Sequence, residues 1–223
     1  MYRSLSDVLR NIGRFKGVEK WQFEIVVTRF DEDLAWTAGL EHLITVYNKG
    51  LPFPPGHSFS KVKEVPNHGV GCETILRHCM EEYDSLAEIT LFSQATLCDR
   101  EDQPMFELYR YFSDGGPDKI VGIKTMSYDP PTSRFQWRIS NPSCKSINDR
   151  NLGEFRRLAV KQPYRFLSED WVKGDWISVG RNKIQKWPKK YYVNLYAACA
   201  FERGILVEEC WFLERSFYSI FSK

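Results

Sequence analysis

Acidic and basic side chains are unevenly distributed along this chain of 223 residues, although its net charge is only +2. Eight acids and one base lie between Glu81 and Glu107, whereas the segment from Arg150 to Lys190 holds eleven bases and four acids. Carboxylates bind divalent cations, and basic side chains bind anions such as a diphosphate. The distribution therefore fits an active site that needs both positive and negative side chains. It fits equally a protein with one acidic and one basic surface that are both exposed to solvent.

Three short apolar runs in the first hundred residues predict β-strands that would position such groups. They are Phe23–Thr28, Leu43–Tyr47 and Glu88–Ser93, and the helix-like segments Leu34–Leu40 and Glu73–Tyr83 lie between them. This β-α-β-α-β order predicts an α/β fold, in which a mostly parallel sheet with right-handed crossovers is flanked by helices. Ligands of such sheets bind at the carboxyl ends of the strands.

The residues that follow each predicted strand would lie together at that edge of the sheet. They supply carboxylates, an amide, an arginine and a lysine, although most loops are polar in any case. Asp31 could instead cap the following helix, and Lys49 could be a solvated turn residue. The candidates are Arg29, Asp31 and Asp33 after the first strand, Lys49 after the second, and Gln94 to Asp99 after the third.

Weaker signals continue through the rest of the chain. We expect an N-terminal helical extension over residues 1–20 and one domain over residues 21–223. Helices are predicted over residues 2–12, 104–112, 152–160, 189–199 and 208–221, strands over 120–123 and 176–179, a loop over 65–71 and a turn over 182–184.

Several classes of protein are disfavoured. The balanced charge argues against a nucleic-acid binder that works by bulk charge. No stretch reaches the roughly 18 apolar residues of a membrane span, and no signal peptide is recognisable, so we expect a cytoplasmic protein. The motifs of dinucleotide sites, P-loops, nucleophile elbows and zinc proteases are absent. The six cysteines form no C-x-x-C pair and are expected to be buried, reduced thiols.

Several segments resemble, in order and spacing, a domain family of uncharacterised function from fungi, bacteria and large algal viruses. That family is similar in layout to nucleotide-diphosphate-sugar transferases with the GT-A fold. The resemblance implies a GT-A-like, Rossmann-like single domain, in a host cell if the source is viral. The matching segments are Ile25–Trp36 (IVVTRFDEDLAW), Val46–Gly50 (VYNKG), Pro66–Gly69, Thr74–Leu76, Tyr83–Ala87, Phe92–Gln94, Gly174–Ile184 and Glu214–Phe221.

The resemblance also implies a site for Mn²⁺ or Mg²⁺ after the third predicted strand, where GT-A enzymes carry an Asp-x-Asp motif. The family pattern Q-G-x-P-x-D-H aligns with Gln94 to Arg100, so Asp99 stands at the position of the family's Asp. Asp99 is the best candidate for metal binding and catalysis, and Asp102 or Glu101 comes next. The chain departs from the family at Ala95 and Arg100, and also at Val70 and Gly71, which replace an Arg-Glu pair.

The remaining candidates follow from what a sugar transferase needs. The nucleotide sugar would contact Thr28, Arg29, Asp31, Asp33, Lys49 and Gln94. Arg181 and Lys183 would bind the diphosphate, and Trp176 would stack on a sugar ring or pack in the core. If the reaction inverts the sugar, a carboxylate must act as general base. The spacing selects none of the three possible residues, Glu208, Glu209 and Glu214.

The leading hypothesis is a metal-dependent glycosyltransferase that moves a sugar from a UDP- or GDP-sugar to a glycan or other hydroxyl acceptor. One alternative is a non-catalytic module on the same fold that binds carbohydrate or protein. Another is a hydrolase of nucleotide sugars. The chain is also compatible with being one domain of a longer, multidomain transferase.

Overall fold

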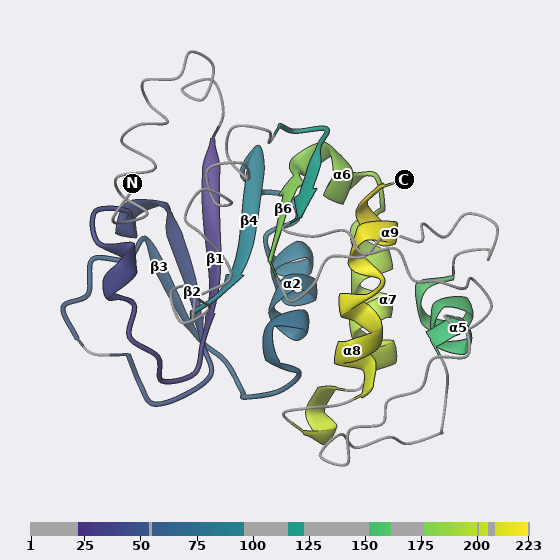
Figure 1. Ribbon diagram of the computed structural model, residues 1–223, viewed down its shortest axis with the longest axis horizontal. Coiled ribbons are helices and arrows are strands. Elements are labelled where there is room, and N and C mark those ends of the chain that lie inside the picture. The colour runs from purple at the N-terminus through teal and green to yellow at the C-terminus, as the bar shows by residue number, and fades with distance from the viewer. Residues whose placement is uncertain are drawn as a thin grey trace.

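A six-stranded mixed sheet forms the centre of the molecule (Figure 1). The computed structural model describes residues 22–53, 55–95, 116–122, 152–161, 176–199, 201–204 and 208–222. Within them the strand order is β3-β2-β1-β4-β6-β5, and the chain forms a single α/β domain. The strands are β1 (Phe23–Arg29), β2 (Ile44–Asn48), β3 (Lys61–Glu64), β4 (Ile89–Gln94), β5 (Ile120–Gly122) and β6 (Ile177–Gly180).

The first four strands form the parallel part of the sheet. Strand β1 lies at its centre, with β2 on one side and β4 on the other, and β3 extends the sheet beyond β2. The middle of β1 is buried on both faces, as its continuous apolar run predicts. This confirms the three predicted strands. Strand β3 was missed because its sequence, KVKE, is polar, as is common in an edge strand.

Strands β6 and β5 complete the sheet in antiparallel orientation. Ile89 at the start of β4 pairs with Gly180 at the end of β6, and Phe92 pairs with Ile177. The two strands predicted over residues 120–123 and 176–179 are therefore confirmed to within one residue. Because β6 runs antiparallel to β4, the residues that follow β6 lie away from the carboxyl end of β4.

Helices cover one face of the sheet, and α2, α7, α8 and α9 lie on that side (Figure 1). Val26, Tyr47 and Phe92 of the sheet belong to this larger core cluster. On the other face, Ile25 and Val27 pack with Leu34, Leu40 and Trp176 among others. The helices are α2 (Val70–Glu81), α5 (Leu152–Phe155), α6 (Arg181–Gln185), α7 (Lys189–Cys199), α8 (Glu208–Glu214) and α9 (Phe217–Ser222), with 3-10 turns η2 (Ala35–Thr37), η3 (Glu41–Leu43) and η6 (Phe201–Arg203) and a π-helical segment η4 (Arg156–Val160).

The predicted helices differ from the observed ones mainly at their ends. Helix α2 begins three residues early, only a 3-10 turn forms within residues 34–40, and residues 181–185 are helical where a turn was expected over 182–184. The predicted last helix is divided into α8 and α9. At the division, the Ser216 hydroxyl donates to the carbonyl of Phe212 at 2.6 Å, a side-chain bond of the kind that bends helices.

Some expectations fall outside the described residues, namely the extension over residues 1–20 and the helix over residues 104–112. Cys72, Cys79, Cys199 and Cys210 are buried free thiols, which confirms the prediction for those four. Among the described residues, no helix has the length and apolar character needed to cross a membrane.

Candidate functional site

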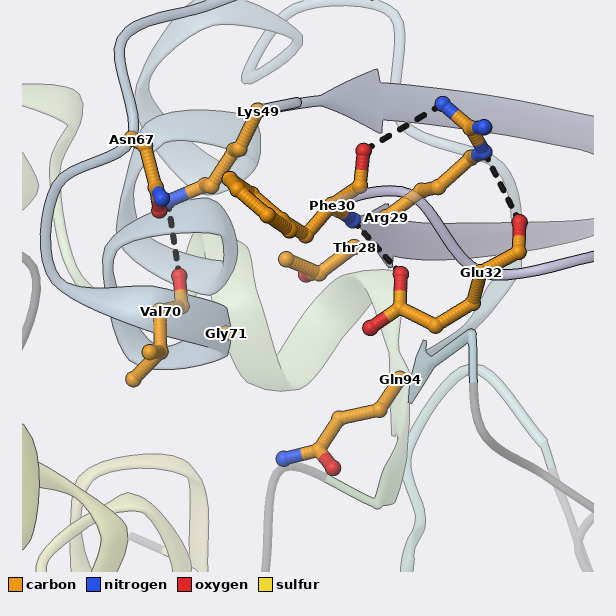
Figure 2. Close-up of a pocket in the computed structure, with 9 residues that line it drawn as sticks. All are labelled: Thr28, Arg29, Phe30, Glu32, Lys49, Asn67, Val70, Gly71 and Gln94. Atoms are coloured by element: carbon orange, nitrogen blue, oxygen red, sulfur yellow. Dashed lines mark hydrogen bonds between the residues drawn. The ribbon is translucent and has the colours of Figure 1, made fainter. Parts of the chain in front are cut away.

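A pocket lies where the order of the sheet reverses. From β1 the chain adds β2 and β3 on one side, and then returns through α2 to place β4 on the other side of β1. In open α/β sheets, ligands bind outside the carboxyl ends of the strands at such a switch point. A hollow of about 170 Å³ occupies this position (Figure 2). It is lined by Thr28, Arg29, Phe30, Glu32, Lys49, Asn67, Val70, Gly71 and Gln94, and we call it the switch-point pocket.

The amino end of α2 forms one wall of this pocket. The helix begins at Val70, directly after its N-cap Gly69, and the φ angles of Gly69 and Val70, 58° and 40°, are both left-handed. Glycine is required at the first of these positions because an added Cβ would lie 2.4 Å from a ring carbon of Phe201. Val70 and Gly71 line the pocket, and Gly69 provides no side-chain cap. The first N–H groups of a helix have no partner within the helix, and together with the helix dipole they favour an anion.

Lys49 lies beneath this wall and is almost completely buried. Its ammonium donates to the carbonyls of His68 at 2.5 Å and Val70 at 2.7 Å, and to Glu73 Oε2 at 2.7 Å. An ammonium has three protons, so all of its donors are already used. Lys49 is therefore neither a solvated turn residue nor a side chain with a donor to spare for a phosphate. Its hydrogen bonds to the His68 and Val70 carbonyls instead fix the backbone at the start of α2, where Gly69 and Val70 are left-handed.

Glu73 is the buried anion that makes this arrangement possible. Its side chain is 0% exposed, and its second oxygen accepts from Arg77 Nε and from the Tyr196 hydroxyl, both at 2.6 Å. Burial lowers the pKa of Lys49, and the charge of Glu73 offsets only part of that effect. The network joins the pocket wall to α7, which carries Tyr196.

Some of the Arg29 donors already form hydrogen bonds to the loop that follows β1. Its Nε donates to the Glu32 carbonyl at 2.9 Å, and Nη1 donates to Asn48 Oδ1 at 2.6 Å and to the Phe30 carbonyl at 3.3 Å. The guanidinium also stacks on the Phe53 ring, 4.8 Å from its centre. Its remaining nitrogen, Nη2, has no partner among the described residues and is available to a ligand.

Several polar groups converge on the pocket from different elements. Thr28 ends β1 beside Gln94 of β4, with which it pairs in the sheet, and Asn67 belongs to the loop before α2. Within the described part of the chain, the Thr28 hydroxyl and the Asn67 amide form no hydrogen bond. The Gln94 side chain lies below the other labelled residues in Figure 2, and its amide is directed away from them. A few convergent polar groups are typical of a ligand site, although the volume of about 170 Å³ lies below the usual range of about 300–1,000 Å³.

A second hollow, of about 430 Å³, borders the first and shares Arg29 and Glu32 with it. The candidates Asp31 and Asp33 line this second hollow rather than the pocket. Asp33 Oδ1 accepts from the N–H of Ala35, the first residue of η2, at 2.9 Å, and Asp31 makes no such bond to this turn. Asp31 Oδ1 accepts from the N–H of Leu51 at 2.8 Å and thereby connects the two loops.

Arg181 and Lys183 do not lie at this edge of the sheet. Arg181 is 3.8 Å from Glu88, just before β4, whereas the pocket lies beyond Gln94 at the other end of that strand. At 3.3 Å per residue, the two ends of β4 are about 17 Å apart. The expectation that these bases face a diphosphate with Thr28 is therefore corrected, because β6 runs antiparallel to β4.

The other predicted site residues are also placed away from the two hollows. Trp176 is 2% exposed and belongs to the core cluster, so of its two alternatives core packing is the one observed. Glu209 is buried in α8, and Glu214 ends that helix 3.4 Å from Arg215. Neither glutamate lines either hollow.

The metal candidates Asp99, Asp102 and Glu101 lie outside the described residues. Among the residues that are described, no three His, Cys, Asp or Glu side chains lie close enough together to hold a metal ion. The switch-point pocket has one carboxylate in its described lining, that of Glu32.

Reasoning from sequence missed five lining residues, Phe30, Glu32, Asn67, Val70 and Gly71. Glu32 was in the polar turn after the first strand, but its neighbours Asp31 and Asp33 were chosen instead. Asn67, Val70 and Gly71 were assigned to a loop that ended before the helix. The Asn-His-Gly sequence at residues 67–69 was the available signal, since a glycine that begins a helix often marks a backbone that can approach a ligand closely.

Comparisons of the chain with protein-family models, with curated proteins and with solved structures find no match.

Proposed function

We propose that this protein is a glycosyltransferase that transfers a sugar from a nucleotide-diphosphate sugar to a hydroxyl acceptor, assisted by a divalent cation. The observation that carries the proposal is the position of the pocket at the switch point between β1 and β4. Sheets of this kind bind nucleotides at that position, outside the carboxyl ends of the strands. The earlier resemblance to nucleotide-sugar transferases points in the same direction.

The amino end of α2 is the feature that suits the diphosphate. Its first N–H groups and its dipole favour negative charge beside Val70 and Gly71. Lys49 contributes indirectly, since it fixes the backbone from which those N–H groups project. Arg29 Nη2 supplies a cationic donor at the boundary of the two hollows.

The polar groups without partners suit the uncharged parts of the same ligand. A ribose or a hexose presents several hydroxyls, which need both donors and acceptors. The Thr28 hydroxyl and the Asn67 amide provide both within the switch-point pocket.

The cation would be Mn²⁺ or Mg²⁺, which neutralises the charge of the departing diphosphate when bound. Such ions bind one or two carboxylates together with phosphate oxygens and water. The described lining, with its single carboxylate, is compatible with this need only if a further ligand comes from elsewhere. Asp99, five residues after Gln94 in the chain, remains our candidate, followed by Asp102.

A second candidate function is a non-catalytic binding module on the same fold. The family that the chain resembles has an Arg-Glu pair where this chain has Val70 and Gly71, and these two residues line the pocket. Loss of two charged groups from the pocket wall would be expected of a domain that still binds a ligand but no longer turns it over.

Thermal unfolding in the presence of UDP- and GDP-sugars, with and without Mn²⁺, tests the proposal. A ligand at one hundred times its dissociation constant adds about 2.7 kcal/mol of stability, which raises Tm by several degrees in a chain of this size. We expect one class of nucleotide sugar to do this, and Asn67→Ala to weaken its binding about tenfold.

The matched control is Asn194→Ala, since Asn194 is exposed on α7 and lines neither hollow. It should leave the ligand-dependent shift unchanged. The absence of any shift with every nucleotide sugar would exclude the proposal. A shift without release of nucleoside diphosphate would favour the binding module.

A further inference from the structure

The second hollow has the lining of a site for a neutral, hydroxyl-rich molecule. Three aromatic rings stand together on its wall: the centre of the Phe53 ring lies 5.1 Å from that of His57 and 5.4 Å from that of Phe59. Aromatic rings offer an apolar surface to the C–H groups of a sugar. Its volume of about 430 Å³ lies within the usual range for ligand pockets, about 300–1,000 Å³.

Carboxylates supply the polar part of this lining. Asp31, Asp33 and Glu41 each accept a backbone N–H through one oxygen, from Leu51, Ala35 and Gly39 respectively. The other oxygen of each has no partner among the described residues, so it can accept from a hydroxyl. Together with Glu32, the lining has four carboxylates and one arginine, Arg29. Because negative charge predominates, the hollow would repel an anionic ligand.

Glu32 is the acid that borders both hollows. Its Oε2 accepts from the N–H of Phe30 at 2.6 Å, and its carbonyl accepts from Arg29 Nε at 2.9 Å. The first bond holds the carboxylate and the second holds the backbone of Glu32, and Oε1 has no partner in the described part of the chain. The carboxylate lies on the side of the pocket where Thr28 and Gln94 are found (Figure 2).

We propose that the second hollow binds the acceptor sugar and that Glu32 is the general base for the transfer. This rests on the proposed function, because the donor must occupy the switch-point pocket. The acceptor hydroxyl gives its proton to Glu32 Oε1 as its oxygen bonds to the anomeric carbon of the donor. The bond from that carbon to the diphosphate oxygen breaks, and the nucleoside diphosphate leaves with the electron pair. The product has the inverted configuration, and Glu32 later returns its proton to water.

The other ionisable groups of the two hollows are less suited to this role. Arg29 stays protonated and cannot act as a base. Asp31, Asp33, Glu41 and His57 line the second hollow alone, and Glu209 and Glu214 line neither hollow. A base must be within hydrogen-bond reach of the acceptor hydroxyl at the point where the donor's anomeric carbon lies. Only a group at the boundary of the two hollows meets that requirement.

The test is Glu32→Gln, whose amide oxygen can still accept from Phe30 but cannot take a proton. Release of nucleoside diphosphate would be measured with the nucleotide sugar that stabilises the wild type, and with methyl glucoside, methyl galactoside and methyl mannoside as acceptors. We expect transfer to fall at least about 100-fold while the ligand-dependent Tm shift is retained. Methyl glucuronide should be a poorer acceptor for the wild type than methyl glucoside.

Glu88→Gln is the matched control, since the same chemical change is made at the opposite end of β4. It should transfer within twofold of the wild type. Transfer by Glu32→Gln within tenfold of the wild type would overturn the inference and leave the proposed function standing. Loss of the Mn²⁺-dependent Tm shift in this variant would also overturn it, because Glu32 would then be a metal ligand. If the wild type binds no nucleotide sugar, or binds one without turnover, the proposed function fails and the inference fails with it.

Discussion

Lys49 shows how far the role of one residue depends on partners that are distant in sequence. A lysine before a glycine at the end of a strand has the composition of an exposed turn, and its position at a ligand edge suggested contact with a nucleotide. The structure instead buries it against Glu73, which is 24 residues away. No local pattern predicts such a pair, because the pairing depends on how α2 packs on the sheet.

Lys49→Met should destabilise the fold strongly. The substitution keeps most of the apolar stem but leaves Glu73 buried without one of its cations, and two backbone carbonyls lose their donor. Breaking a buried pair in this way costs about 3 kcal/mol or more. Urea unfolding would measure the effect as a lower midpoint with an unchanged slope.

Lys61→Met provides the comparison, because Lys61 forms an exposed ion pair with Glu82 at 2.5 Å. Exposed pairs contribute about 0–1 kcal/mol, so this variant should stay close to the wild type. A Lys49→Met protein as stable as Lys61→Met would show that the buried pair is not formed.

At the scale of elements, the strands were the most predictable part of the fold. Three of the four parallel strands in the first hundred residues, β1, β2 and β4, are short apolar runs bounded by turn residues, and a pattern of this kind is local. The start of α2 was not predictable in the same way. It depends on two left-handed residues, Gly69 and Val70, and on Phe201 packing against the first of them.

Gly69→Ala tests this entry into α2. Alanine at this position would have to adopt the left-handed backbone of Gly69. Its Cβ would lie 2.4 Å from Phe201 and 2.8 Å from Glu73. The backbone effect costs about 1 kcal/mol and the overpacking about 2 kcal/mol more. We therefore expect Tm to fall by roughly 6–12 °C in a chain of this length.

Gly56→Ala separates the two contributions. Gly56 also has a positive φ, of 83°, but an added Cβ would meet nothing within 4 Å. It should lose about 1 kcal/mol, from the backbone effect alone. Equal losses in the two variants would contradict the packing of Phe201 against the helix entry.

At the scale of the whole molecule, sequence indicated which edge of the sheet to examine but not which residues meet there. The polar turns after β1 and β4 do converge, since both strands are parallel and adjacent, and Thr28, Arg29 and Gln94 line one pocket. Arg181 and Lys183 were predicted to bind the diphosphate of the same ligand, but they follow β6, which runs in the opposite direction to β4. Strand direction is a long-range property, and the basic segment carries no local signal of it.

The distribution of charge also takes on a more specific meaning at this scale. The switch-point pocket combines a helix amino end and one arginine nitrogen with a single carboxylate, and the neighbouring hollow is predominantly acidic. This arrangement separates a place suited to an anionic donor from a place suited to a neutral acceptor. Glu32 and Arg29 form the boundary between them.

The most direct test of the central claim is a crystal structure with the stabilising nucleotide sugar and Mn²⁺ bound. We expect the diphosphate oxygens about 3 Å from the N–H groups at the amino end of α2, between the ends of β1 and β4, with the sugar directed toward Glu32. A nucleotide bound anywhere other than the switch-point pocket, or a pocket that stays empty at saturating ligand, would contradict the account.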